Sequence, residues 1–189
     1  MPELPTHTLP DADALHACFA AEGPSSAGIW LRIARRDAAL VTVEQQEAVR
    51  VALCHGWIDG QVQRCDEESF LQRFTPRRAR SRWSRRNVGI AEQLIADGEM
   101  RPTGQAEVDR ARADGRWEAA YAGQATIEVP ADLQAALDAD PTAAAFFATL
   151  SSQNRYAILY RIHDARRPET RARRIARFVA MCAAGETVH

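Results

Sequence analysis

Apolar residues recur with two different periods along the first 90 residues of this chain. They alternate with polar residues over 27–35, 57–64 and 69–75, and a period of two predicts strands there. Over 12–22 and 43–54 they recur every three to four residues, which predicts two helices. Strands of this length with short connections favour a small antiparallel sheet with helices packed against it.

Residues that begin helices support these boundaries. Asp11 is suited to cap the first helix, and Thr42 with Gln45 has capping-box spacing at the start of the second. Ser84 is the expected N-cap of a third helix. Residues 1–10 carry three prolines and predict a loose arm.

From Trp83 onward the apolar spacing is helical throughout. Four prolines lie where the first turn of a helix tolerates them: Pro102, Pro130, Pro141 and Pro168. Three glycines lie where helices end: Gly98, Gly115 and Gly185. The sequence therefore predicts an α+β fold with a mainly helical C-terminal half. The α+β core is expected over 1–88, and the helical region over 89–189 is expected to pack on it as one compact unit.

Charge changes this picture, because the net value of −1 hides three strongly charged blocks. All 24 basic residues are arginine, whose planar fork can grip carboxylate or phosphate at two points. Residues 73–86 hold seven arginines and no acid, whereas residues 92–140 hold eleven acids and four arginines. Residues 161–177 hold seven arginines and two acids. The chain is arginine-rich in two separate places.

The composition excludes several classes of protein. At 189 residues and 46% hydrophobic, the chain is long enough to form a core without disulfides or a structural metal. The first 19 residues lack a secretory pattern, and no apolar run approaches the roughly 20 residues of a membrane span. The four cysteines are scattered and read as reduced thiols. These features predict a cytoplasmic protein without a metal or another cofactor.

Four blocks of sequence carry a family resemblance: GIWLRIAR (28–35), ALCHGWIDG (52–60), RFTPRRARSRWSRRN (73–87) and RYAILYRIHDARRPETRARRIARFVAM (155–181). In this order they resemble the YdeI/OmpD-associated family, also called bacteriocin-protection proteins. The resemblance runs from about Phe19 to His189. It implies a bacterial protein associated with stress or bacteriocin tolerance, and it implies no particular reaction.

The arginine block over 73–86 is the main candidate for a site, because it combines forked donors with aromatic residues and a nearby helix start. This chemistry predicts binding of a phosphate-bearing ligand or nucleic acid. The expected binding residues are Trp57, Arg73, Thr75, Arg77, Arg78, Ser81, Trp83, Arg85, Arg86 and Asn87. An equally weighted interpretation is internal: the acidic segment 92–140 folds back and neutralises these arginines, with arginine stems packed on Trp83.

Asp59 is a weak candidate for catalysis. It shares a strand face with Trp57, and an acid beside an indole ring can act as a general acid or base. A structural role is favoured, in which Asp59 accepts hydrogen bonds from the turn or pairs with an arginine of 73–86. His55 beside Cys54 and His163 near a helix end are read as structural.

Three functions therefore remain open, and the sequence contains no recognisable catalytic motif. The preferred one is a non-catalytic binding protein for a phosphate-bearing ligand or nucleic acid. The second is a small-molecule enzyme with Asp59 as acid or base and Arg73 or Arg77 as an anion clamp. The third is a protein–protein interaction module, and a homo-oligomer stays open as well.

Overall fold

The computed structural model describes residues 4–189 and divides the chain into two compact units. The N-terminal unit ends at Ala120, and the C-terminal unit comprises Tyr121–His189. The sequence placed the change from the α+β core to the helical region after residue 88. The unit boundary comes later because two further helices, α3 (Arg85–Ala96) and α4 (Pro102–Ala113), both pack against the preceding helix α2 (Gln45–Cys54).

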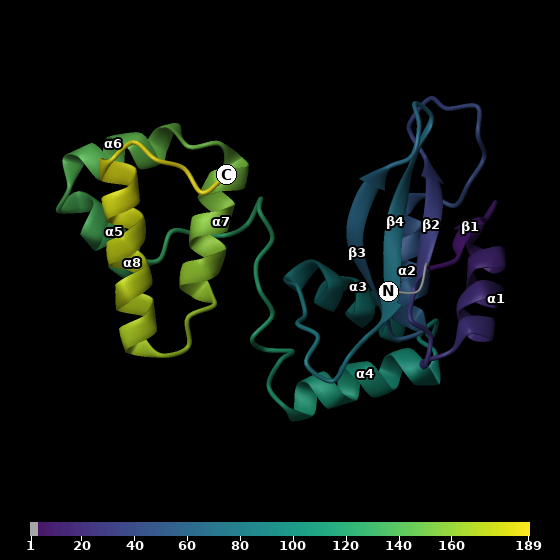
Figure 1. Cartoon of the computed structure of the whole chain (residues 1–189). Helices are drawn as coiled ribbons and strands as arrows, with labels where there is room; N and C mark the ends of the chain where they lie inside the picture. The colour runs from purple at the N-terminus through teal and green to yellow at the C-terminus, as the bar shows by residue number, and fades with distance from the viewer. Residues whose placement is uncertain (1–3) are drawn as a thin grey trace. The chain divides into compact units, whose positions relative to one another are not determined.

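The N-terminal unit is built on a four-stranded sheet (Figure 1). Its strands, in the spatial order β1-β2-β4-β3, are β1 (Thr6–Thr8), β2 (Ile29–Ala34), β4 (Ser69–Pro76) and β3 (Trp57–Arg64). The α+β class and three of the strands agree with the sequence. The sheet is mixed instead of antiparallel, because β1 runs parallel to β2.

The expectation of a loose arm is wrong for residues 6–8, which form β1. The backbone N–H of Trp30 donates to the carbonyl of Pro5 at 2.8 Å, next to the point where β1 pairs with β2. Pro5 and Pro10 lie on either side of this short strand and interrupt none of its pairing. Proline content alone therefore does not show whether this segment forms a strand.

The core of the N-terminal unit forms where the apolar side of β2 meets helices α1 (Ala12–Glu22) and α2. Ile29, Leu31 and Ile33 alternate with partly exposed residues along β2, as expected for a strand with one buried face. Phe19 of α1 packs on Trp57, with ring centroids 4.7 Å apart. Trp57 is only 1% exposed, so it belongs to this core.

Helix starts follow the predicted chemistry in some places and depart from it in others. The side chains of Asp11 and Ser84 cap α1 and α3, as the sequence indicated. The capping box predicted for α2 is wrong, since Glu44 is the N-cap and makes no side-chain capping bond. The Thr42 hydroxyl instead accepts a hydrogen bond from the N–H of Ala34 at 2.8 Å, which ties the loop to the end of β2.

The C-terminal unit is wholly helical and has a core of its own (Figure 1). Its helices are α5 (Ala131–Asp138), α6 (Pro141–Thr149), α7 (Ser152–His163) and α8 (Pro168–Ala183). Pro141 and Pro168 occupy first-turn positions as predicted, whereas Pro130 is the N-cap of α5. The predicted buried stripe of α8 is confirmed at Ile175, Phe178 and Cys182. Within residues 4–189, no helix has the length and apolar character that crossing a membrane requires.

Candidate anion-binding surface

The predicted arginine block runs from β4 through the connecting segment into the first turn of α3, and residues 77–86 are called the arginine loop below. A turn organises its first half: the N–H of Ser81 donates to the carbonyl of Arg78 at 2.8 Å. The Ser81 hydroxyl in turn accepts the N–H of Arg78 at 2.9 Å. Arg80 lies inside this turn, and Arg85 and Arg86 are the first two residues of α3.

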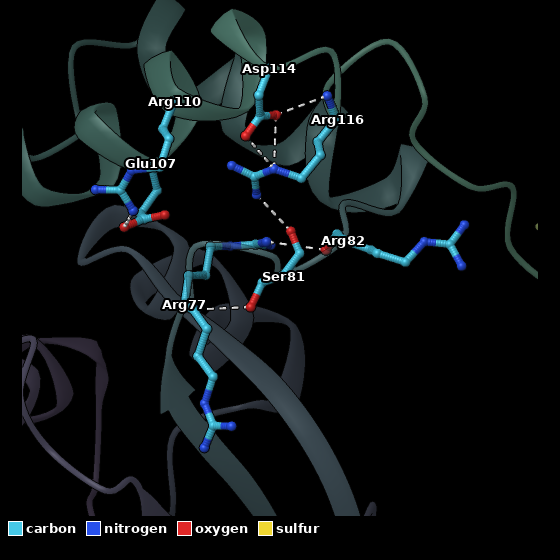
Figure 2. A network of polar contacts seen from close by, with 8 residues as sticks. Arg77, Ser81, Arg82, Glu107, Arg110, Asp114 and Arg116 are labelled. Carbon is cyan, nitrogen blue, oxygen red and sulfur yellow. Dashed lines mark hydrogen bonds and ion pairs between the residues drawn. The ribbon is translucent and has the colours of Figure 1, made fainter. Parts of the chain in front are cut away.

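Two arginine side chains hold the backbone of the arginine loop (Figure 2). Arg77 donates from Nη1 to the carbonyl of Arg82 at 3.2 Å, and Arg116 donates from Nη1 to the carbonyl of Ser81 at 2.7 Å. The Nε of Arg116 lies 2.8 Å from both carboxylate oxygens of Asp114. The hydrogen bond from Arg116 holds the pKa of Asp114 below its usual value. This ion pair lies just after the C-terminus of α4 and orients Arg116 toward the loop.

A stack of two tryptophans flanked by two arginines includes two residues of the loop itself, Arg77 and Trp83. The guanidinium carbon of Arg77 lies 3.6 Å from the centroid of the Trp83 ring, and that ring packs edge-on against Trp117 at 4.8 Å. Arg112 lies 5.0 Å from the Trp117 centroid on the outer side. Because Trp83 is 2% exposed and Arg77 is 7% exposed, this stack is part of the fold. Packing of an arginine on Trp83 is what the internal interpretation anticipated.

The remaining predicted residues separate into buried and exposed groups. Trp57, Trp83 and Asn87 are buried, so none of them offers a ring or amide at the surface. Arg73 and Thr75 are half-buried on β4, opposite Trp30 and Ile58 of the neighbouring strands. Ser81 is also half-buried and is used within the turn. The exposed members are Arg78, Arg80, Arg85 and Arg86.

The four exposed arginines form no ion pair with any residue in 4–189. The acidic segment 92–140 does supply ion pairs, but they go to arginines elsewhere. Asp97 and Glu99 pair with Arg50, Glu107 with Arg110, Asp114 with Arg116 and Asp132 with Arg171. The acidic segment 92–140 therefore does not neutralise these four arginines through ion pairs.

Most of the chain, residues 7–107, matches a family model described as a domain of unknown function (DUF8412). The chain belongs to this family. Residues 126–185 match a second model, described as "Bacteriocin-protection, YdeI or OmpD-Associated". The resemblance noted in the sequence is confirmed over that part of the chain, whereas its three N-terminal motifs lie within the DUF8412 match. No curated protein and no solved structure matches the chain.

In the DUF8412 region, Asp59 lies on β3 opposite Phe74, immediately before a bulge that ends at Val62. The half-buried Asp59 carboxylate makes no hydrogen bond or ion pair with another described residue. The expected pair with an arginine of 73–86 is thus not formed. The bulge itself is held by Gln72, whose side-chain amide donates to the carbonyl of Gly60 at 3.0 Å.

The structure also brings together a histidine pair that sequence reasoning missed. The Nδ1 of His16 on α1 lies 2.9 Å from the Nε2 of His55 at the end of α2. Burial and the nearby Arg101 lower the pKa of both rings, that of His55 to about 4. The two residues are 39 positions apart, so no local spacing signals the pair. Within residues 4–189, no group of three or more histidine, cysteine or acidic side chains is arranged to hold a metal ion.

The region matched by the bacteriocin-protection model contains the second basic block, and two of its arginines stabilise the helical bundle. Arg171 forks onto Asp132, with Nε at 2.5 Å and Nη2 at 2.9 Å from the two carboxylate oxygens. Its Nη1 also donates to the carbonyl of Ile162 at 3.0 Å, so one side chain joins α5, α7 and α8. Arg174 donates to the carbonyl of Arg161 and lies 3.6 Å from Asp164.

Proposed function

We propose that this protein binds a phosphate-bearing ligand or nucleic acid through the arginine loop, and that it does so without catalysing a reaction. The observation that carries the proposal is the set of four exposed arginines without an acidic partner among the described residues: Arg78, Arg80, Arg85 and Arg86. Guanidinium groups that are free of internal ion pairs retain their forked donors for phosphate oxygens.

Preorganisation of the loop supports this function. A binding loop that is already ordered loses less conformational entropy when its partner arrives. Here Arg77 and Arg116 hold the loop backbone (Figure 2). The four exposed arginines belong to the same ten residues.

The start of α3 provides a second argument. Arg85 and Arg86 occupy the first turn of this helix, which contains no acidic residue. The N-terminus of a helix carries partial positive charge, so cations there cost stability, commonly about 0.3–1 kcal/mol each. A bound phosphate would be attracted by the arginines and by the helix terminus together.

The match to a bacteriocin-protection family supports a role in stress or bacteriocin tolerance, with anion binding as its molecular basis. We further propose that the protein works in the cytoplasm. All four cysteines are free thiols, and Cys54 and Cys182 are buried, which suits a reducing compartment. Asp59, Arg73 and Thr75 are not needed for this function as we propose it.

The test compares two variants that lose equal charge in the N-terminal unit. The first replaces Arg78, Arg80, Arg85 and Arg86 with glutamine, and the control replaces the exposed Arg35, Arg36, Arg64 and Arg101. Binding of a fluorescein-labelled 20-base-pair DNA duplex and of inorganic pyrophosphate is measured between 50 and 200 mM salt, chosen because phosphate contacts make affinity steeply salt-dependent across roughly this range.

We expect the loop variant to lose binding to both probes or to the duplex alone, while the control keeps most of it. If all four arginines contact duplex phosphates, the slope of log K against log salt should fall by about 3 to 4. Loss with the duplex alone would identify a polymer as the partner. Equal binding by the parent and the loop variant, or equal loss in both variants, would refute the proposal.

A further inference from the structure

The second basic block divides its arginines between two tasks. Arg171 and Arg174 face the bundle and are held by acids and backbone carbonyls. Arg173 and Arg177, on the same helix, are exposed and form no ion pair with any residue the structure describes. They are four residues apart, so their Cα atoms lie one helical turn apart, with about 6 Å of axial rise between them.

Arg177 also borders a cavity of about 590 Å³ on the surface of the C-terminal unit. Arg161 of α7 lines the same cavity and is also exposed, and its Nη1 donates to the carbonyl of Ala157 at 2.8 Å. The apolar part of the lining comes from Phe178, Met181 and Val188, and the polar part comes from Glu186 and Thr187. A volume of this size lies within the usual range for small-molecule sites, roughly 300–1,000 Å³.

The wall formed by residues 186–188 is fixed to the bundle. The backbone N–H groups of Val188 and His189 donate to the side-chain oxygen of Asn154 at 3.1 and 3.0 Å. The N–H of Glu186 donates to the carbonyl of Met181 at 3.0 Å. These bonds hold the segment that carries Glu186 and Thr187 in the lining, so the cavity exists without a ligand.

The mixture of groups selects among anionic ligands. The two arginines of the lining favour a phosphate, and its apolar side chains favour a flat or apolar group attached to that phosphate. An alkyl chain in the cavity would leave the carboxylate of Glu186 beside hydrocarbon, which costs free energy. A nucleobase avoids this cost, because the exocyclic amine of cytosine can donate to a glutamate carboxylate. Arg173 lies outside the lining but is exposed one helical turn before Arg177, which makes it available for the next phosphate of a strand.

We propose that the C-terminal unit holds one nucleotide of a single-stranded nucleic acid in this cavity. Arg161 and Arg177 bind its phosphate, Arg173 binds the adjacent phosphate, and Glu186 accepts a hydrogen bond from the base. The proposal goes beyond the proposed function, because its site is separate from the arginine loop and its partner is a single strand. Each site can therefore fail without the other.

The test uses the full chain and two fluorescein-labelled 12-nucleotide probes, oligo(dC) and oligo(dT), with binding followed by fluorescence anisotropy. One variant carries R173Q and R177Q, and its matched control carries R35Q and R64Q, which also removes two exposed arginines. A third variant, E186Q, keeps the size of the side chain and removes its charge. Far-ultraviolet circular dichroism checks that every variant retains its helical content.

We expect R173Q/R177Q to weaken binding of both probes about tenfold and to lower the salt slope by about 1.4, since single strands lose roughly 0.7 per contact. The R35Q/R64Q control should lose less than threefold. The parent should prefer oligo(dC), because thymine presents a carbonyl where cytosine presents its amine. E186Q should reduce that preference at least threefold while leaving the salt slope unchanged.

Three results would overturn the inference: no binding of either probe by the parent, equal affinity of the parent and R173Q/R177Q, or a base preference that E186Q leaves intact. The loop variant with four glutamines separates the two proposals. If that variant loses single-strand binding while R173Q/R177Q retains it, the cavity is not a nucleotide site and the arginine loop stands. If the loop variant retains binding of the single-strand and duplex probes while R173Q/R177Q loses single-strand binding, the proposal for the arginine loop is wrong and the proposal for the cavity stands.

Discussion

Replacing Arg85 with glutamate should stabilise the N-terminal unit while weakening its binding to phosphate. Arg85 is the first residue of α3, its side chain is exposed, and no acid lies in that turn. A charge in the first turn of a helix typically changes stability by about 0.3–1 kcal/mol. Reversing the charge removes an unfavourable interaction and adds a favourable one. We therefore expect a gain of about 1 kcal/mol at low salt for the solvent-exposed site.

The distribution of tryptophan makes this gain measurable in the correct unit. All four tryptophans, Trp30, Trp57, Trp83 and Trp117, lie before Ala120. Urea unfolding followed by tryptophan fluorescence therefore reports on the N-terminal unit. The free energy of unfolding of a small protein typically falls by about 1–3 kcal/mol per molar urea. A gain of about 1 kcal/mol in that free energy therefore raises the urea midpoint by roughly 0.3–1 M.

The matched control is R64E, which makes the same charge reversal at the exposed end of β3. It should move the midpoint much less, because no helix terminus lies at that position. The R85E gain should shrink in 0.5 M salt, where charges about 5 Å apart are already largely screened. A midpoint that falls or stays unchanged in R85E at low salt would refute the electrostatic reasoning. So would a gain that high salt leaves undiminished.

Two further predictions concern packing and pH. G104A should destabilise the N-terminal unit by about 1–3 kcal/mol, since a Cβ there would lie 2.5 Å from the carbonyls of Leu53 and Cys54. The control G89A, on the open side of α3, should instead stabilise it by about 0.5–1 kcal/mol; urea midpoints that rank the two variants otherwise would contradict this account. The pKa of His55 is lowered to about 4 in the folded protein, against an ordinary value of 6.5. Between these values the unfolded chain binds the proton and the folded chain does not, so stability should fall as the pH drops from 6.5 to 4. H55Q should flatten that part of the profile of urea midpoint against pH, and a parent profile already flat there would count against the assigned pKa.

Local patterns in the sequence determined most of the secondary structure. Alternating apolar residues located β2, and the N-cap chemistry of Asp11 and Ser84 located the starts of α1 and α3. These signals are reliable because side-chain direction in a strand and capping at a helix terminus depend on residues close together in the chain. The same signals failed at β1, which exists only through its pairing with a strand more than twenty residues away.

The candidate site shows the same division between local and tertiary information. The sequence located a dense arginine block, because counting charges requires no three-dimensional knowledge. Only the tertiary structure decided which arginines are used internally: Arg77 packs on Trp83, whereas Arg78, Arg80, Arg85 and Arg86 remain at the surface. Burial and ion pairing depend on Trp117 and Arg116, which lie more than thirty residues further along the chain. A charge pattern therefore states how many cations a segment has, while long-range packing determines which of them can meet a ligand.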